Sequence, residues 1–197
     1  PAVASLGLSP FSVRLGSAVF GVLGIWMIYL MVNEGLKQTK NSVIWNRRFG
    51  WLAAMILALI PWHLHYSRIG FEVTLMVFIL ILSVFVFLKG LVNQRWMMLS
   101  VFLFGINSYS YNIAKMFSSM LLVVCVVVYR KELSRINWKF KSLLVGIFLL
   151  VLMPLVVDSL WGGGSDRFTS LNIFQNPKMV AEINYLRGQD GLDNVIG

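Results

Sequence analysis

Charged residues are scarce in this sequence. Only 13% of its 197 residues are Asp, Glu, Lys or Arg, whereas 58% are hydrophobic. The mean hydropathy is +0.76. A water-soluble fold of this length needs more polar surface than such a composition supplies. The composition therefore excludes a soluble globular domain and predicts an integral membrane protein.

Cysteine and histidine are almost absent. Cys125 is the single cysteine, so an internal disulfide is excluded, and its apolar surroundings predict a small buried hydrophobe. The two histidines, His63 and His65, stand two residues apart. This spacing does not bring two side chains to one face of a helix. A two-histidine metal site is therefore only weakly indicated, and two surface histidines are the favoured interpretation. A role for a divalent metal is left open.

Acidic residues are also few, with 8 against 17 basic residues and a formal net charge of +9. An excess of this kind can indicate a nucleic-acid-binding protein. Here, however, the basic residues lie between apolar runs, where the positive-inside rule for membrane proteins explains them. We therefore expect no nucleic-acid partner.

What the sequence does contain is about six apolar runs, the first of which is close to the ~20 residues that a helix needs to cross a membrane. They predict an all-α, polytopic transmembrane helix bundle. Two runs are short and are expected to tilt or to end below the headgroups. In the first run, Ser17, Gly21 and Gly24 share one face, which favours close helix packing. The runs are residues 13–32, 50–62, 73–88, 96–108, 116–129 and 142–160.

Lysine and arginine are divided unequally between alternate connections. Three connections hold four, two and five of them, eleven together, whereas the other connections and the C-terminal tail hold five. The positive-inside rule therefore predicts a multi-pass plasma-membrane protein whose two chain ends both lie on the non-cytoplasmic side. The basic connections are residues 33–49, 89–95 and 130–141.

Two polar clusters fall on the predicted outer face: residues 63–72 (the 63–72 cluster) and residues 109–115 (the 109–115 cluster). Ionisable groups at membrane depth are costly unless they pair or face a cavity. Arg68 and Lys115 offer the cations that a lipid phosphate needs. Glu72 would orient Arg68, bind a metal or help to activate an acceptor. Further hydrogen bonds would come from Ser67, Tyr111 or a histidine.

The same residues also allow a structural interpretation. If residues 67–72 begin the third span, Arg68 and Glu72 stand at positions i and i+4 and would form a salt bridge. Lys115 would be a snorkelling lysine. Four aromatic residues would be anchors at the membrane surface: Trp62, Tyr66, Tyr109 and Tyr111.

Four motifs follow one another in an order that resembles the multispan GT-C glycosyltransferases. The resemblance is to family 39, which holds the protein mannosyltransferases and the bacterial lipid A aminoarabinose transferases, and it covers nearly the whole chain. The motifs are FSVRLGSAVFGVLG, PWHLHYSRIGFE, GINSYSYNIAKMF and DRFTSLNIF.

The resemblance implies transfer of a sugar from a polyprenyl-phosphate donor, dolichyl or undecaprenyl phosphate, to a glycan, lipid or protein acceptor on the outer face. It implies roles for Arg68 and for Glu72, as a supporting acid, near the donor phosphate or a metal. Lys115 stands where the family often has arginine, a departure from the pattern. Arg14 matches an arginine at the outer start of a span.

In such enzymes the main catalytic acid lies in a first outer loop, which would precede Pro1. We therefore expect residues 1–161 to be a partial transmembrane glycosyltransferase domain, covering about the second to seventh spans. Residues 162–197 would begin a large extracytoplasmic loop. By this interpretation the chain is truncated at both ends and inactive by itself.

Two other functions stay open. One is a multispan transporter or lipid-linked sugar flippase. Such proteins favour broken helices, midplane charges and repeated halves. The sequence shows neither repeated halves nor charges in the inner portions of the runs. The other is a non-catalytic membrane scaffold, in which the outer arginine and glutamate would pair with each other.

Overall fold

The computed structural model describes residues 7, 9–37, 43–111 and 113–161, and every regular element among them is an α-helix. This confirms the predicted all-α class for that part of the chain. The chain divides into two units, Pro1–Leu152 and Met153–Gly197. The loop predicted at residues 162–197 lies outside the described residues.

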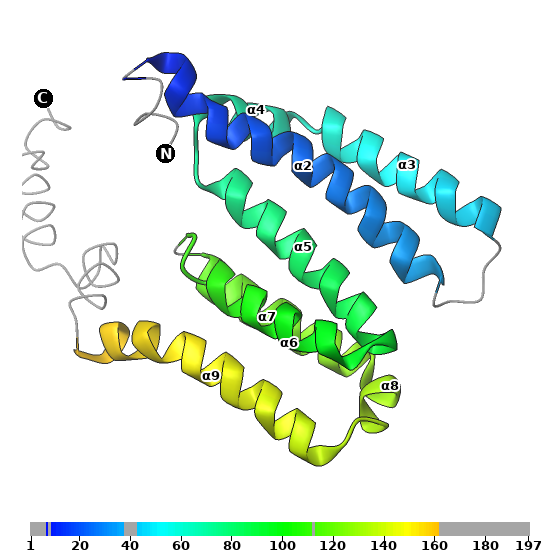
Figure 1. The fold of residues 1–197 in the computed structure, drawn as a ribbon. Helices are drawn as coiled ribbons and strands as arrows, with labels where there is room; N and C mark the ends of the chain where they lie inside the picture. Colours follow the sequence, from blue (N-terminus) through cyan, green and yellow to red (C-terminus); the bar gives the residue numbers. More distant parts are fainter. Residues whose placement is uncertain (1–6, 8, 38–42, 112, 162–197) are drawn as a thin grey trace, which may run out of the picture. The chain divides into compact units, whose positions relative to one another are not determined.

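Each predicted apolar run overlaps a helix, but most helices begin or end several residues beyond it, and the run at residues 50–62 is divided between two helices (Figure 1). Two short helices were not predicted: α8 in the most basic connection, and α4, which follows the break at Ile60. The helices are α2 (Pro10–Lys37), α3 (Val43–Leu59), α4 (Pro61–Ile69), α5 (Val73–Val92), α6 (Gln94–Asn107), α7 (Ala114–Val128), α8 (Arg130–Ser134) and α9 (Trp138–Trp161).

By length and composition, three of these helices can cross a membrane: α2, α5 and α9. Helices α3 and α4 together would make a fourth span, bent by 60° between them. Helices α6 and α7, with 14 and 15 residues, are shorter than the ~20 residues of a full crossing. Six spans, and the side that each chain end faces, therefore stay predictions.

Local sequence signals set the ends of several helices. Pro61 opens α4, at a position where its missing N–H is not needed. Gly70 closes α4 with φ 88°, a conformation that glycine adopts without steric cost. Asn93 caps α6, because its Oδ1 accepts the backbone N–H of Arg95 at 3.2 Å.

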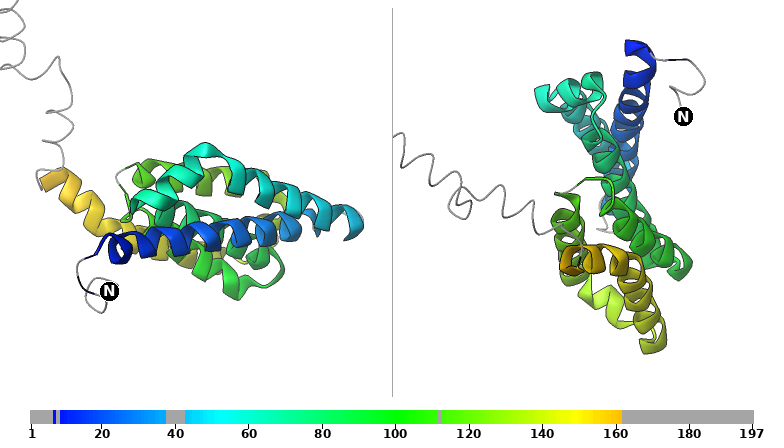
Figure 2. Two further views of the ribbon diagram at one scale, coloured as in Figure 1. Left: turned by 90° about the horizontal axis from the view of Figure 1, so that it is seen from above. Right: turned by 90° about the vertical axis from the view of Figure 1, so that its left-hand side faces the viewer.

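Helix α2 packs against α3, α4 and α5, and Figure 2 shows α2 and α3 side by side along their lengths. The rings of Tyr29 and Trp51 join α2 to α3 with their centroids 5.0 Å apart. Phe20 and Phe78 join α2 to α5 at 5.4 Å.

Helices α5 and α6 form a hairpin held by a buried hydrogen bond. The Ser100 hydroxyl donates to the Ser83 carbonyl at 2.8 Å. A Cβ added to Gly90 would lie 2.9 Å from the backbone nitrogen of Met97. The two backbones therefore approach each other more closely than a side chain at this position would allow.

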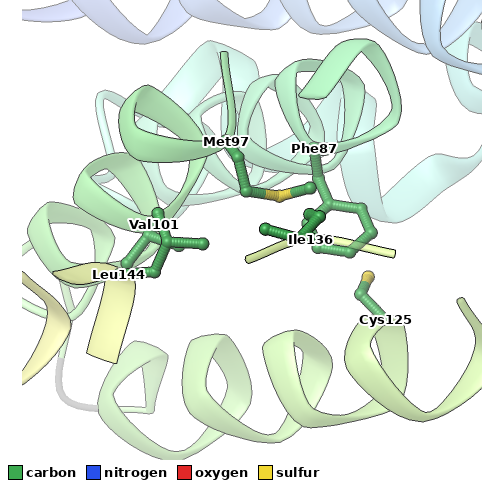
Figure 3. Packing of buried hydrophobic residues seen from close by; sticks show 6 residues of the cluster. All are labelled: Phe87, Met97, Val101, Cys125, Ile136 and Leu144. Atoms are coloured by element: carbon green, nitrogen blue, oxygen red, sulfur yellow. The ribbon is translucent and has the colours of Figure 1, made fainter. Parts of the chain in front are cut away.

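The apolar core of the first unit draws on all the later helices. Cys125 belongs to it and is 7% exposed, which confirms its predicted burial. In Figure 3 the side chains from α5, α6 and α9 gather above α7. The buried members are Phe87, Met97, Val101, Cys125, Ile136 and Leu144.

Because successive helices reverse direction, the polar clusters gather at one end of the first unit. The start of α2, helix α4, the start of α5 and the α6–α7 connection share this end, on the left in Figure 1. The connections from α5 to α6 and from α7 to α9, which carry basic residues, share the opposite end.

Candidate functional site

Helix α4 packs against α2 through small residues, and we call this contact the α2–α4 seam. It consists of Ser17, Gly21 and Gly24 on α2, which face His63 and Ser67 on α4. The Ser17 hydroxyl donates to the Ser67 carbonyl at 3.0 Å. A Cβ added to Gly21 would lie 2.8 Å from the Ser67 Cβ. The predicted close packing of the three small residues is confirmed, and it places the residues that follow Ser67.

The two histidines occupy different environments. His63 is 3% exposed, and its Nε2 lies 3.8 Å from where a Cβ on Gly24 would be. His65 is exposed and packs edge-on against the ring of Tyr66 at 5.5 Å. Among the described residues, no group of three or more His, Cys, Asp and Glu is placed to hold a metal ion.

Arg68 and Glu72 do not share a helix. The premise that residues 67–72 begin one helix is wrong, because α4 ends at Ile69 and α5 begins at Val73. Between them, left-handed Gly70 lies close to α2, and a Cβ there would be 3.3 Å from the Val13 carbonyl oxygen. Arg68 and Glu72 are both exposed, and no ion pair joins them within the described ranges.

The 109–115 cluster is held by two side-chain contacts. The buried Asn107 amide donates to the Ser118 hydroxyl at 2.8 Å, which joins α6 to α7. The Tyr109 hydroxyl donates to the Val151 carbonyl on α9. Tyr109 therefore ties the α6–α7 connection to α9, a contact that the prediction of a membrane-surface anchor did not include.

The two clusters lie at the same end of the first unit, but each is held by its own contacts. Tyr111 and Lys115 are half-buried, whereas Arg68, Glu72 and Arg14 are exposed. In the part of the chain that the structure describes, no hydrogen bond, ion pair or ring contact joins the 63–72 cluster to the 109–115 cluster. The structure thus brings Ser67 and His63 against α2, and it leaves Arg68 and Arg14 exposed and Lys115 half-buried.

Sequence reasoning missed one polar residue beside this seam. Thr74 on α5 is 4% exposed, and its methyl group lies 3.6 Å from where a Cβ on Gly21 would be. Its Oγ1 and the Nδ1 of His63 are buried and have no hydrogen-bond partner among the described residues. The available signal was a threonine at the second position of the apolar run at residues 73–88, in which Ser83 is the other hydroxyl-bearing residue.

The dolichyl-phosphate-mannose-protein mannosyltransferase family matches residues 2–157, which is most of the chain. The chain belongs to this family. The predicted resemblance to the GT-C glycosyltransferases is therefore confirmed. Mannosyltransferase-family enzymes of this type are membrane-embedded and use a lipid-linked sugar donor. Separate comparisons with curated proteins and with solved structures returned no match.

Proposed function

We propose that the protein transfers a sugar from a polyprenyl-phosphate donor to a glycan, lipid or protein acceptor at the extracytoplasmic surface of the plasma membrane. Family membership supports the class of reaction. The observation that carries the finer proposal is the gathering of the 63–72 and 109–115 clusters at one end of the first unit, opposite the α5–α6 and α7–α9 connections.

The donor phosphate would be bound by Arg68 and Lys115. Arg68 lies in the last turn of α4 with an exposed side chain that makes no ion pair within the described ranges. Its guanidinium can therefore offer two parallel N–H groups to a phosphate. Lys115 lies at the first turn of α7 and would add a second positive charge, with Tyr111, four residues before it in the α6–α7 connection, as a hydrogen-bond donor.

Glu72 would act in support of Arg68. It lies at the N-cap of α5 and is exposed. A carboxylate there can orient the guanidinium or accept a proton from the acceptor. We assign it this supporting role and not that of the main catalytic acid.

The remaining residues of the cluster would position α4 or border the site. The Ser67 hydroxyl donates to the Leu64 carbonyl at 3.0 Å and would have to rotate to reach a phosphate. His63 is buried in the α2–α4 seam, so we assign it a positioning role. His65 and Arg14 are exposed at the same end and would lie at the margin.

The proposal is tested with the purified full-length protein and a polyprenyl-phosphate-linked sugar, by following the covalent product. Arg68→Gln is expected to lower transfer at least tenfold, because a hydrogen bond to a charged group contributes about 1.5–3 kcal/mol. Glu72→Gln is expected to lower it as well. Arg135→Gln removes an equal charge from an exposed position in the α8–α9 connection and is expected to leave transfer unchanged.

Unchanged transfer in both Arg68→Gln and Glu72→Gln would remove these residues from the site. Flux of the lipid-linked sugar across proteoliposomes without a covalent product would replace the transferase by a transporter or flippase. Repeating the assay with EDTA tests whether a divalent metal takes part.

A further inference from the structure

A cavity of about 700 Å³ opens between α7, α8 and α9; we call it the α7–α9 groove. Its floor is the apolar core itself, because Phe87, Met97 and Val101 line it (Figure 3). Val126 of α7 and Val145 of α9 belong to its walls. The volume lies in the range of pockets that hold small organic ligands.

The apolar groove has a cationic rim. Arg130 and Lys141 line it together with Ser134 and Ser142. Arg130 is exposed, and the Lys141 ammonium is 3.5 Å from the Ser134 carbonyl oxygen, which leaves it further donors. Trp138, 77% exposed, lines the same part of the groove and is the residue type that lies at membrane–water interfaces.

We propose that the α7–α9 groove binds one acyl chain of an anionic glycerophospholipid, with its phosphate held by Arg130 and Lys141. The apolar walls offer van der Waals contacts to an acyl chain, whereas they offer few hydrogen bonds to a water-soluble ligand. The two cations at the rim match a phosphate in charge. The cationic rim of the groove, on α8 and the start of α9, lies at the opposite end of the first unit from Arg68, so this site is separate from the proposed donor site.

The basic residues that bind the lipid headgroup and the groove that holds the acyl chain make separable contributions to this binding. Each basic residue near an anionic headgroup contributes roughly fivefold in affinity, so removing both is expected to cost roughly 25-fold. The tail contributes only if the groove is open. Filling the groove should therefore release anionic and zwitterionic lipids alike, whereas removing the charges should abolish only the preference between them.

The experiment compares phosphatidylglycerol with phosphatidylcholine of the same chain length, bound to the purified full-length protein, by native mass spectrometry and thermal melting. Arg130→Gln with Lys141→Gln is expected to remove the preference for phosphatidylglycerol. The matched control is Lys131→Gln with Lys139→Gln, which makes the same change in charge at exposed positions outside the groove and should keep the preference.

Val126→Trp, which places a large ring in the groove, is expected to lose the retained lipid. Val127→Trp is its control, since Val127 is 60% exposed and does not line the groove. Equal retention of the two lipids by the unmodified protein, or an equal loss in both double variants, would overturn the proposal. So would phosphatidylglycerol retained by Val126→Trp, or a polyprenyl phosphate that displaces it at lower concentration.

Discussion

At one end of the first unit α4 lies on α2 through glycine and serine contacts, whereas at the other end α7, α8 and α9 enclose an apolar cluster that stays partly open. The α2–α4 seam contains a hydrogen bond between helices, and the Ser67 Cβ lies too close to Gly21 to leave room for a Cβ there. The α7–α9 groove is lined by large apolar side chains with two cations at its rim.

The two contacts differ in the size of the side chains that lie between their helices, and the membrane environment gives the physical reason. Lipid tails are as apolar as leucine, so helices associate there through close packing of small residues and through hydrogen bonds. Such a contact determines the position of α4 tightly, which suits a site that must orient charged groups. A groove lined by large side chains at the other end suits a flexible acyl chain instead.

Breaking the seam sterically should have the largest effect. Gly21→Leu forces its side chain against the Ser67 Cβ, and overpacking of this kind costs about 1–3 kcal/mol. We expect a lower thermal midpoint and more than a tenfold loss of sugar transfer, because α4 carries Arg68. Gly16→Leu is the control, since a Cβ there has nothing within 4 Å. Equal loss of activity in both variants would contradict the role of the seam.

The contact that holds the second cluster should have a smaller effect. Asn107→Ala and Ser118→Ala each break the buried 2.8 Å hydrogen bond between α6 and α7. A double-mutant cycle on unfolding in detergent is expected to give a coupling of about 0.6–1.7 kcal/mol, as for other hydrogen bonds between membrane helices. Strictly additive losses would show that this bond does not hold the α6–α7 connection.

The smallest effect is expected from removing single hydroxyl groups, and it distinguishes the candidate site from the rest of the helix bundle. Ser17→Ala and Ser100→Ala each remove a hydroxyl that donates to a carbonyl of another helix, at 3.0 Å and 2.8 Å. Each should cost about 0.5–1.5 kcal/mol of stability. Only Ser17→Ala is expected to lower sugar transfer, by a few-fold, because only Ser17 supports α4. A similar drop in transfer for Ser100→Ala would remove the distinction.

Much of the fold was predictable because it depends on local pattern. Apolar runs longer than about a dozen residues form helices in a membrane, since only a helix satisfies its own backbone there. The face shared by Ser17, Gly21 and Gly24 was likewise readable from their spacing. The interruption between Arg68 and Glu72 was also visible in principle, because a glycine after a helical stretch is a common helix end.

The sequence by itself determined the long apolar helices, the membrane class and, through the order of its motifs, the mannosyltransferase family. Only the tertiary structure decided that His63 is buried while His65 is exposed, and that Tyr109 reaches Val151. Only it assembled the α7–α9 groove, from residues between Phe87 and Leu149. The physical reason is that a helix forms from contacts within four residues, whereas each of these features depends on which distant helix lies beside it.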